Sequence, residues 1–325
     1  MKIALIGSGT IVPVFLEAAA KEPLAEIYAI FGREKSIEKL KTFQEKYDIP
    51  VIYHDYDKLL ADEQIDAVYM ALNNHLHYAF AKKAIEAGKH VIMEKPFTST
   101  YVQAKELAEL AEKNNVFVFE AISNIYTPNF LKTKELLSQI GDVKIVQMNF
   151  SQYSKRYDSF KQGTVLPVFD KAMHGGALVD INVYNIHFIM ALFGKPQGIH
   201  YSANMERGID TSGILVMEYP TFQCVAIGAK DCKAPLAINI QGDKGYIHST
   251  ELPNEYNNFV LGMNDGGTEY FDLNNSEPRL LHELRTFVKM VENSDYELAK
   301  ERMAHTLNVM EVMDEARAQV GLVFE

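Results

Sequence analysis

Short apolar runs alternate with amphipathic stretches along the first part of the chain. The apolar runs have the length of buried strands and cover residues 2–6, 24–31, 51–53, 67–72, 90–93 and 116–119. Helical periodicity covers residues 12–20, 36–47, 75–87 and 99–113, and Ser36 is in position to cap the second of these helices. Strands that alternate with helices of this length predict βαβ units in a parallel sheet. We therefore predict an α/β class protein whose residues 1–122 form a doubly wound Rossmann domain.

The pattern changes after Glu120. Residues 142–153 alternate polar and apolar positions as a long strand does, and several strand-like segments separated by turn signals fill residues 199–271. Helices are predicted at residues 128–139, 176–193, 278–291 and 296–320, of which the second is apolar enough to be buried. We predict that residues 123–325 form an α+β domain with a large, mostly antiparallel sheet.

Composition narrows the class of protein. The chain has 325 residues, 47% hydrophobic and 23% charged, which is enough for two domains with sizeable cores. Its formal net charge of -11 opposes binding to nucleic acid or to an anionic membrane surface. Residues 1–20 resemble a secretory signal, but glycines and Pro13 interrupt the apolar run, so a strand, a turn and a helix are predicted there. Cys224 and Cys232 lack metal-type spacing, which predicts free thiols and a cytoplasmic protein.

A glycine-rich turn follows the first predicted strand. Gly7-x-Gly9-x-x-Val12 almost matches the dinucleotide fingerprint, with Val12 in place of the third Gly or Ala. Gly7 allows a tight turn, Gly9 lets the backbone approach a pyrophosphate, and the next helix offers N–H groups at its N-terminus. The predicted cofactor-binding residues of this turn are Gly7, Ser8, Gly9, Thr10 and Ile11.

The end of the second predicted strand indicates which dinucleotide binds. An NAD site places an acid about twenty residues past the fingerprint, to bond the ribose 2′-hydroxyl. Here the stretch reads Phe31-Gly32-Arg33-Glu34, and its first polar side chain is Arg33, whose charge and fork geometry suit a 2′-phosphate. We predict NADP(H) as the cofactor, bound in part by Gly32 and Arg33. Glu34 leaves NAD open, and a solvated loop charge is the alternative role for Arg33.

The residues after the fourth predicted strand, Leu72-Asn73-Asn74-His75-Leu76-His77, open a helix at the same sheet edge. We predict that Leu72, Asn73 and Asn74 line the nucleotide crevice, with Asn74 as the N-cap. The H-x-H spacing suggests metal, but residues i and i+2 of a helix point to different faces and no third ligand is near. No metal is therefore predicted, and His77 is expected to touch the cofactor or the core.

Two further segments carry candidate chemistry. A buried strand ends in Glu94-Lys95-Pro96, which places an acid and a base where open α/β sheets hold ligands; the alternative is a surface ion pair at a strand exit. Later, paired glycines precede a helix in which Asp180, Tyr184 and His187 occupy positions i, i+4 and i+7 of one face. An acid, a phenol and an imidazole on one stripe suggest a site, although a stripe that bonds its own sheet or a subunit partner is the alternative.

Taken together, these motifs resemble the glucose–fructose oxidoreductase / inositol dehydrogenase / MocA (Gfo/Idh/MocA) family over nearly the whole length of the chain. The segments that carry the resemblance are Gly7-Ser8-Gly9, Ala87-Gly88-Lys89-His90-Val91, Glu94-Lys95-Pro96, Glu120-Ala121 and Gly175-Gly176-Ala177-Leu178-x-Asp180. The resemblance implies that Lys95 lies beside the nicotinamide and the reacting hydroxyl, with Glu94 at the cofactor, and that the Lys95–Pro96 bond is often cis. Asp180-Ile181-Asn182-Val183-Tyr184 is similar to the branch of dihydrodiol and sugar dehydrogenases, in which Tyr184 would exchange the hydroxyl proton. A phenol has an ordinary pKa of about 10, and a nearby lysine cation favours its phenolate.

Several residues depart from the family pattern. His174 stands in place of the first of three glycines, and Asn182 in place of a glycine inside the helix motif. Leu72 and Asn73 replace the usual Thr-Pro, and Ile125 and Thr127-Pro128 replace an arginine and a His-Pro pair. These differences predict a substrate pocket that has diverged from those of relatives.

We therefore expect an NADP(H)-preferring oxidoreductase that acts on a secondary alcohol or ketone of a sugar, polyol or diol. Tyr184 would handle the hydroxyl proton, Lys95 would orient that hydroxyl, and Asp180 would bond substrate or Lys95. Residues 151–156 would reach over the cofactor, unless they form only a basic turn. A catalytically silent nucleotide-binding regulator of the same fold is the alternative, and an assembly scaffold is a third. Relatives also suggest a homodimer or homotetramer formed through the C-terminal sheet.

Overall fold

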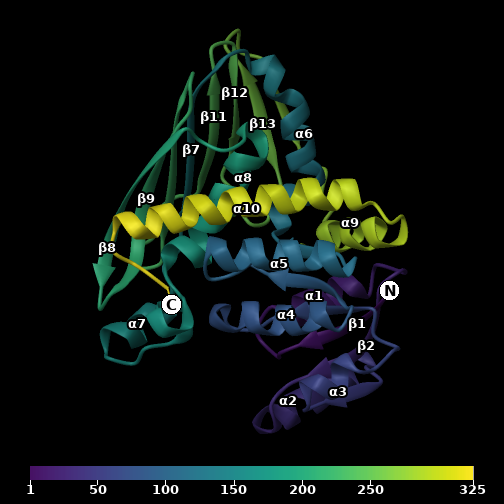
Figure 1. Cartoon of the computed structure of the whole chain (residues 1–325). Coiled ribbons are helices and arrows are strands. Elements are labelled where there is room, and N and C mark those ends of the chain that lie inside the picture. The colour runs from purple at the N-terminus through teal and green to yellow at the C-terminus, as the bar shows by residue number, and fades with distance from the viewer. Residues whose placement is uncertain (325) are drawn as a thin grey trace. The chain divides into compact units, whose positions relative to one another are not determined.

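The computed structural model describes residues 1–324 and divides the chain into two compact units. Unit 1 contains Met1–Ala121 and Pro278–Leu307, and unit 2 contains Ile122–Glu277 and the chain from Asn308 onward. The division into residues 1–122 and 123–325 remains a prediction about domain limits, and it did not include the return of Pro278–Leu307 to the first unit. Figure 1 follows the chain from purple at the N-terminus to yellow at the C-terminus.

The sheet of unit 1 has six strands, all parallel, in the order β3-β2-β1-β4-β5-β6. Its strands are β1 (Lys2–Ile6), β2 (Glu26–Phe31), β3 (Val51–Tyr53), β4 (Ala67–Met70), β5 (His90–Glu94) and β6 (Val118–Ala121). The order reverses between β1 and β4, which is the topological switch point where doubly wound sheets bind dinucleotides. The predicted Rossmann sheet is confirmed.

Unit 1 also contains several helices and short turns. They are α1 (Val12–Ala19), α2 (Ile37–Tyr47), α3 (Tyr56–Leu60), α4 (His77–Glu86), α5 (Tyr101–Asn114), α9 (Leu281–Glu292) and the first part of α10 (Tyr296–Gln319), with 3-10 turns η1 (Glu34–Ser36) and η2 (Asn74–Leu76). Ser36 occupies the predicted N-cap position of α2 without a side-chain capping bond, because η1 runs directly into the helix. The short helix α3 was not predicted; the Asp55 side chain caps it by accepting from Asp57 N and Lys58 N.

The segment Pro278–Leu307 packs on unit 1 through aromatic stacking. The ring of Phe287 lies 4.6 Å from that of Phe119 at an interplanar angle of 5°, and Tyr296 stacks on Phe117 at 4.5 Å. Both phenylalanines belong to the segment around β6, at one edge of the sheet. These contacts cover apolar side chains that the edge strand would otherwise expose.

The sheet of unit 2 has eight strands in the order β14-β13-β12-β11-β7-β10-β9-β8. Only β7 and β10 pair in parallel, so the prediction of a mostly antiparallel sheet is confirmed. Its strands are β7 (Val143–Ser151), β8 (Gly198–Glu206), β9 (Ile209–Glu218), β10 (Gln223–Ala229), β11 (Ala237–Gly242), β12 (Gly245–Ser249), β13 (Phe259–Met263) and β14 (Thr268–Phe271).

One face of this sheet is covered by α8, which contacts β7 and β10. The helical segments of unit 2 are α6 (Pro128–Leu136), α7 (Lys155–Lys161), α8 (Val183–Phe193), a π-helical turn η7 (Leu178–Asn182), the 3-10 turns η3 (Ser123–Tyr126), η4 (Leu137–Ile140), η5 (Pro167–Phe169) and η6 (Lys171–Met173), and the end of α10. The helix α7 was not predicted.

Of the described residues, only the stretch Lys171–Phe193 is long and apolar enough to pass for a membrane span, and 78% of its apolar window is buried, as in a core helix.

Candidate functional site

The glycine turn of unit 1 lies where three strands end. Gly7 has a φ of 107° and donates its N–H to Phe31 O at 2.9 Å, and Ala71 N donates to Ile6 O at 2.9 Å. A Cβ on Gly7 would lie 2.5 Å from Ala71 O, so only glycine fits between β1 and β4. Val12, at the third fingerprint position, is fully buried. The turn is therefore tight and packs directly against the ends of β2 and β4, as the first glycine of the fingerprint requires.

A lysine that sequence reasoning missed contacts this turn. Lys39 Nζ donates to Ser8 O from the exposed side of α2, which brings a cation to the backbone that follows β1. Arg33 precedes η1 as its N-cap residue and is exposed, and the adjacent Gly32 O is bonded by His54 Nδ1 at 2.8 Å. The ends of β1 and β2 therefore carry cations that suit a phosphate group. The only sequence signal for Lys39 was a lysine one turn into an amphipathic helix.

The segment after β4 differs from its prediction in one respect. Asn73, not Asn74, occupies the N-cap position of η2, and its side chain makes no capping bond, so the predicted capping role of Asn74 is wrong. The cause is the 3-10 turn at Asn74–Leu76, which starts the helical segment before α4 itself begins. Leu72 and Asn74 are partly buried and Asn73 is exposed at this strand end.

His77 ties the end of β4 to the Glu94-Lys95-Pro96 turn. Its imidazole is fully buried, with Nδ1 2.9 Å from Pro96 O and Nε2 3.2 Å from Leu72 O. Burial lowers the pKa of His77, which favours the neutral ring. Within residues 1–324, no group of three or more His, Cys, Asp or Glu side chains is arranged to hold a metal ion. His77 thus reaches the core, one of the two roles predicted for it.

The turn after β5 is held from several sides. Glu94 is buried and accepts a hydrogen bond from the Tyr69 hydroxyl, while the Tyr69 ring stacks on Phe15 at 3.6 Å. Burial raises the pKa of Glu94. The Lys95–Pro96 peptide is cis, and Phe97 N donates to Glu120 Oε1 at 2.9 Å. Lys95 itself is partly buried at the carboxyl end of the sheet.

In unit 2, a buried aspartate holds the start of the helix that carries Asp180 and Tyr184. Asp210 Oδ2 accepts from Leu178 N at 2.7 Å and from the Tyr201 hydroxyl at 2.9 Å. Burial raises the pKa of Asp210. Gly176 has a φ of 114°, and a Cβ there would overlap Asp210 Oδ1. The absence of a side chain at Gly176 therefore lets this carboxylate reach the first turn, a contact that the sequence motif did not reveal, whereas a Cβ on Gly175 would lie 2.6 Å from Pro167 O.

His174, the first departure from the family's glycine motif, has a φ of 56°. That is the left-handed region in which glycine is usually found, and a histidine there carries a conformational cost. Its ring stacks on Phe324 at 4.7 Å, and the Arg317 guanidinium lies 4.4 Å from the same phenylalanine ring on unit 2. The stacking offsets part of that cost.

The helix after the glycine pair is not a regular α-helix. Leu178–Asn182 form a π-helical turn before α8, so the predicted α-helical spacing of Asp180, Tyr184 and His187 is wrong in its first part. Asp180 is partly exposed, Tyr184 is 8% exposed and His187 is fully buried. Single π turns are frequent at functional sites because they redirect side chains.

Asn182, the second departure, packs against a glycine of the sheet. Its Nδ2 donates to Ala226 O at 3.1 Å, and a Cβ on Gly228 would lie 2.5 Å from Asn182 Cβ. Because Gly228 on β10 has no side chain, the side chain of Asn182 fits against that strand.

The partner of Asp180 within unit 2 is Lys230, which sequence reasoning missed. Lys230 Nζ forms an ion pair with Asp180 Oδ2. The lysine follows β10 directly and its side chain is 11% exposed, whereas that of Asp180 is 33% exposed. The only sequence signal was a charged pair, Lys230-Asp231, at the end of an apolar strand.

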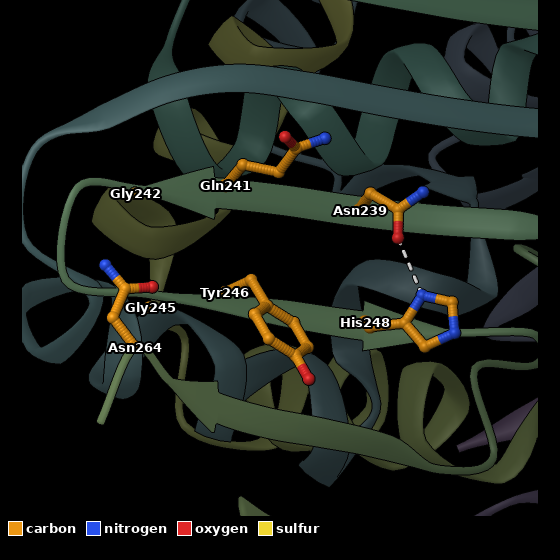
Figure 2. A pocket seen from close by; sticks show the side chains of 7 residues that line it. All are labelled: Asn239, Gln241, Gly242, Gly245, Tyr246, His248 and Asn264. Carbon is orange, nitrogen blue, oxygen red and sulfur yellow. Dashed lines mark hydrogen bonds between the residues drawn. The ribbon is translucent and has the colours of Figure 1, made fainter. Parts of the chain in front are cut away.

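The opposite face of the sheet carries a hollow of about 410 Å³. Figure 2 shows its lining on β11, β12 and the end of β13, where His248 Nδ1 bonds Asn239 Oδ1 at 2.6 Å. The lining contains no Asp, Glu, Lys or Arg and consists of Asn239, Gln241, Gly242, Gly245, Tyr246, His248 and Asn264.

Comparison with known proteins gives the family. Residues 1–122 match the model described as an oxidoreductase family with an NAD-binding Rossmann fold, and residues 130–248 match the Gfo/Idh/MocA C-terminal domain. The chain is 31% identical over 325 residues to scyllo-inositol 2-dehydrogenase (NADP(+)) IolU of Bacillus subtilis, covering 100% of this chain and 98% of the relative. It is 23% identical to trans-1,2-dihydrobenzene-1,2-diol dehydrogenase of Mus musculus, over 100% of this chain and 98% of that protein.

Solved structures show the same fold. The 3-ketoreductase KijD10 of Actinomadura kijaniata, in complex with NADP and TDP-benzene, superimposes with a TM-score of 0.86 at 22% identity, covering 98% of this chain and 97% of the other. Levoglucosan dehydrogenase in complex with NADH and levoglucosan gives a TM-score of 0.83 at 17% identity, over 99% and 97% of the two chains. With two family models and a full-length relative in agreement, the chain belongs to the Gfo/Idh/MocA family of oxidoreductases with an NAD-binding Rossmann fold.

Proposed function

We propose that this protein is an NADP(H)-preferring dehydrogenase or reductase that acts on a secondary alcohol or ketone of a sugar, polyol or diol. The observation that carries the proposal is the full-length likeness to an NADP(+)-dependent inositol dehydrogenase, combined with the presence of both Lys95 and Tyr184. Names of further relatives point to the same class of substrate, since they act on a diol or reduce a ketone.

The residues of unit 1 fit a bound dinucleotide. Because Gly7 has no Cβ, the glycine turn lies directly against Ala71 O and the chain can turn from β1 toward α1. Val12 N is already bonded to Gly9 O at 3.3 Å and Pro13 has no N–H, so the phosphate donors of this turn would be the N–H groups of Thr10 and Ile11. The other proposed cofactor contacts are Ser8, Gly9, Gly32, Arg33, Leu72, Asn73, Asn74, His77, Glu94 and Lys95. NADP(H), when bound, supplies or accepts the hydride.

The proposed roles of the chain's own residues concern the proton. Tyr184 takes the proton from the substrate hydroxyl during oxidation, or gives it during reduction, through its phenolic oxygen. Lys95 donates a hydrogen bond to the same substrate oxygen and favours the phenolate by its positive charge. Asp180 accepts a hydrogen bond from a substrate hydroxyl and fixes the orientation of the substrate.

Arg33 should determine the preference for NADP(H) over NAD(H). Arg33→Gln removes a charge-assisted bond to the 2′-phosphate, so the dissociation constant for NADPH should rise by roughly tenfold to a hundredfold while that for NADH stays the same. Lys39→Gln should act in the same direction with a smaller effect, because Lys39 lies at Ser8 O. Fluorescence titration with both nucleotides measures this. The matched control is Lys41→Gln, whose exposed side chain pairs with Glu38 at 3.7 Å. An equal loss of NADH affinity in Arg33→Gln would refute the 2′-phosphate contact.

Turnover tests the proposed function directly. The purified protein is assayed by nicotinamide absorbance, with NADP(+) and inositols, aldoses and vicinal diols, and with NADPH and the corresponding ketones. At least one of these compounds should be turned over faster with the phosphorylated cofactor than with NAD(H). Binding of NADPH without turnover of any of them would instead favour a nucleotide-binding regulator. Absence of NADPH binding would contradict both functions.

Partner and location are part of the proposal. We propose a homodimer or homotetramer formed through the open face of the unit 2 sheet. The strand register places Tyr246, Gln241 and Ile145 on one row of this face, with Tyr246 and Ile145 40% and 47% exposed. Tyr246 and Gln241 also line the hollow in Figure 2. Static light scattering on the preparation used for turnover gives the assembly mass.

The free thiols of Cys224 and Cys232 support a cytoplasmic location.

A further inference from the structure

Two lysines are buried among residues 1–324, and they differ in what neutralises them. Lys89 and Lys230 are each 8% exposed. Lys89 Nζ donates to two backbone carbonyls, Asp62 O and Ile65 O, both at 2.8 Å, which is a structural arrangement inside unit 1. Lys230 Nζ instead pairs with the carboxylate of Asp180. A buried ammonium needs such a partner, because an isolated charge in the interior is costly.

The pair is asymmetric in its exposure. The side chain of Lys230 is 11% exposed and that of Asp180 is 33% exposed. The Lys230 ammonium is therefore the more buried partner, and the Asp180 carboxylate is the more solvent-exposed one. An ionised carboxylate only accepts hydrogen bonds. The Lys230 cation favours the ionised form of Asp180, so this carboxylate can accept a hydrogen bond from a substrate hydroxyl.

Lys230 is fixed by its backbone on both sides. Its N–H donates to Thr211 O at 2.9 Å, and its carbonyl accepts from Ser154 N at 2.9 Å. The second of these bonds ties Lys230 to residues 151–156, the basic stretch that follows β7. Two backbone hydrogen bonds thus fix the position of the Lys230 backbone, as a positioning residue requires.

The next residue, Asp231, is turned away to other partners. Its Oδ2 accepts from the Thr211 hydroxyl at 2.7 Å and from the Ser212 hydroxyl at 2.8 Å. Lys230 Nζ forms its ion pair with Asp180, although Asp231 is adjacent in sequence.

Asp180 and Tyr184 belong to the same helical stretch of the chain. Asp180 lies in the π turn and Tyr184 in the first turn of α8, four residues later on one continuous helical segment. Asn124 Nδ2 donates to Tyr184 O at 2.9 Å, which fixes the backbone of that turn. An unpaired carboxylate at Asp180 would disfavour a developing phenolate nearby, and the Lys230 cation offsets this repulsion.

We propose that Lys230 is a positioning residue of the reaction, which acts through Asp180. It holds the carboxylate of Asp180 ionised and oriented toward the substrate, and it compensates the charge of Asp180 when Tyr184 handles the hydroxyl proton. This inference rests on the proposed function of Asp180 and Tyr184, and it adds the residue that directly follows β10 to the site residues of unit 2, which otherwise lie on one helical segment.

The test uses single and double variants of the full chain. Lys230→Met should lower kcat by about tenfold to about a hundredfold, less than removal of the group that transfers the proton. The dissociation constant for NADPH should not change. Lys230→Gln, which retains a donor for Asp180 without the charge, should give an intermediate kcat, and it replaces Lys230→Met if that variant does not fold. Lys233→Met, an exposed lysine three residues further on, is the matched control and should keep the kcat of the wild type.

A double-variant cycle separates this role from a structural one. If Lys230 acts through Asp180, Asp180→Asn and Asp180→Asn/Lys230→Met should have the same kcat, because the second change has nothing left to disturb. Multiplied losses in the double variant would overturn the inference, as would a wild-type kcat in both Lys230 variants. Should Asp180→Asn be slow while the Lys230 variants are not, only this inference fails. A fully active Asp180→Asn would instead remove the proposed role of Asp180, and the role of Lys230 with it.

Discussion

Replacement of Lys95 by methionine should lower kcat by roughly 10²- to 10⁴-fold, the range found for loss of a positioned proton-handling or hydroxyl-orienting group. Lys95 follows β5 directly, and the residues around it are held by His77 at Pro96 O and by Glu120 at Phe97 N. None of these bonds uses the lysine ammonium, and methionine retains much of its apolar stem. The variant should therefore fold and bind NADPH, and turnover alone should be lost.

Steady-state kinetics and NADPH titration on the same preparation measure this. The control is Lys83→Met, whose side chain is 56% exposed and pairs with Asp57 at 2.9 Å, a surface ion pair of little energetic value. Undiminished kcat in Lys95→Met on a good substrate would remove the catalytic assignment of Lys95. A large loss of NADPH affinity with unchanged kcat would instead make Lys95 a cofactor-binding residue only.

Tyr184→Phe should reduce kcat by a similar factor, about 10²- to 10⁴-fold, because it removes only the hydroxyl that exchanges the proton. The ring of Tyr184 is 8% exposed and lies 6.2 Å from that of Phe150, and phenylalanine preserves this packing. The bond from Asn124 Nδ2 to Tyr184 O involves only the backbone. Stability should therefore change little.

The matched control removes another buried phenol from the same unit. Tyr219 donates to Gly194 O at 2.8 Å, so Tyr219→Phe should cost stability by about 1 kcal/mol and leave kcat intact. Thermal unfolding and kcat, measured side by side for both variants, separate the two roles. If Tyr184→Phe and Tyr219→Phe behave alike, Tyr184 is a structural residue and another group must transfer the proton.

The sequence predicted what local patterns determine. The alternation of apolar and amphipathic segments predicted the parallel sheet of unit 1. The fingerprint predicted the turn after β1, because a side chain at Gly7 would collide with Ala71 O. Parallel strands then bring their carboxyl ends to one edge, so the candidate residues of unit 1 follow from the strand order.

Contacts between distant segments could not be predicted in this way. Lys230 and Asp180 are 50 residues apart, Leu178 and Asp210 are 32 apart, and Lys39 and Ser8 are 31 apart. Each contact depends on how strands pair and how helices pack, and the local periodicity of hydrophobic residues does not contain that information. The return of Pro278–Leu307 to unit 1 was missed for the same reason, since its aromatic partners lie near β6.

The π-helical turn at Leu178–Asn182 has a consequence for how relatives should be aligned. A π turn contains one residue more than an α turn, and each residue of an α-helix advances the direction of its side chain by about 100°. A chain with an ordinary α turn here, one residue shorter before the position of Tyr184, would direct that side chain about a quarter-turn away from its present direction. In this branch of the family, a single insertion or deletion before Tyr184 would therefore alter the phase of the helix as effectively as a substitution alters its chemistry.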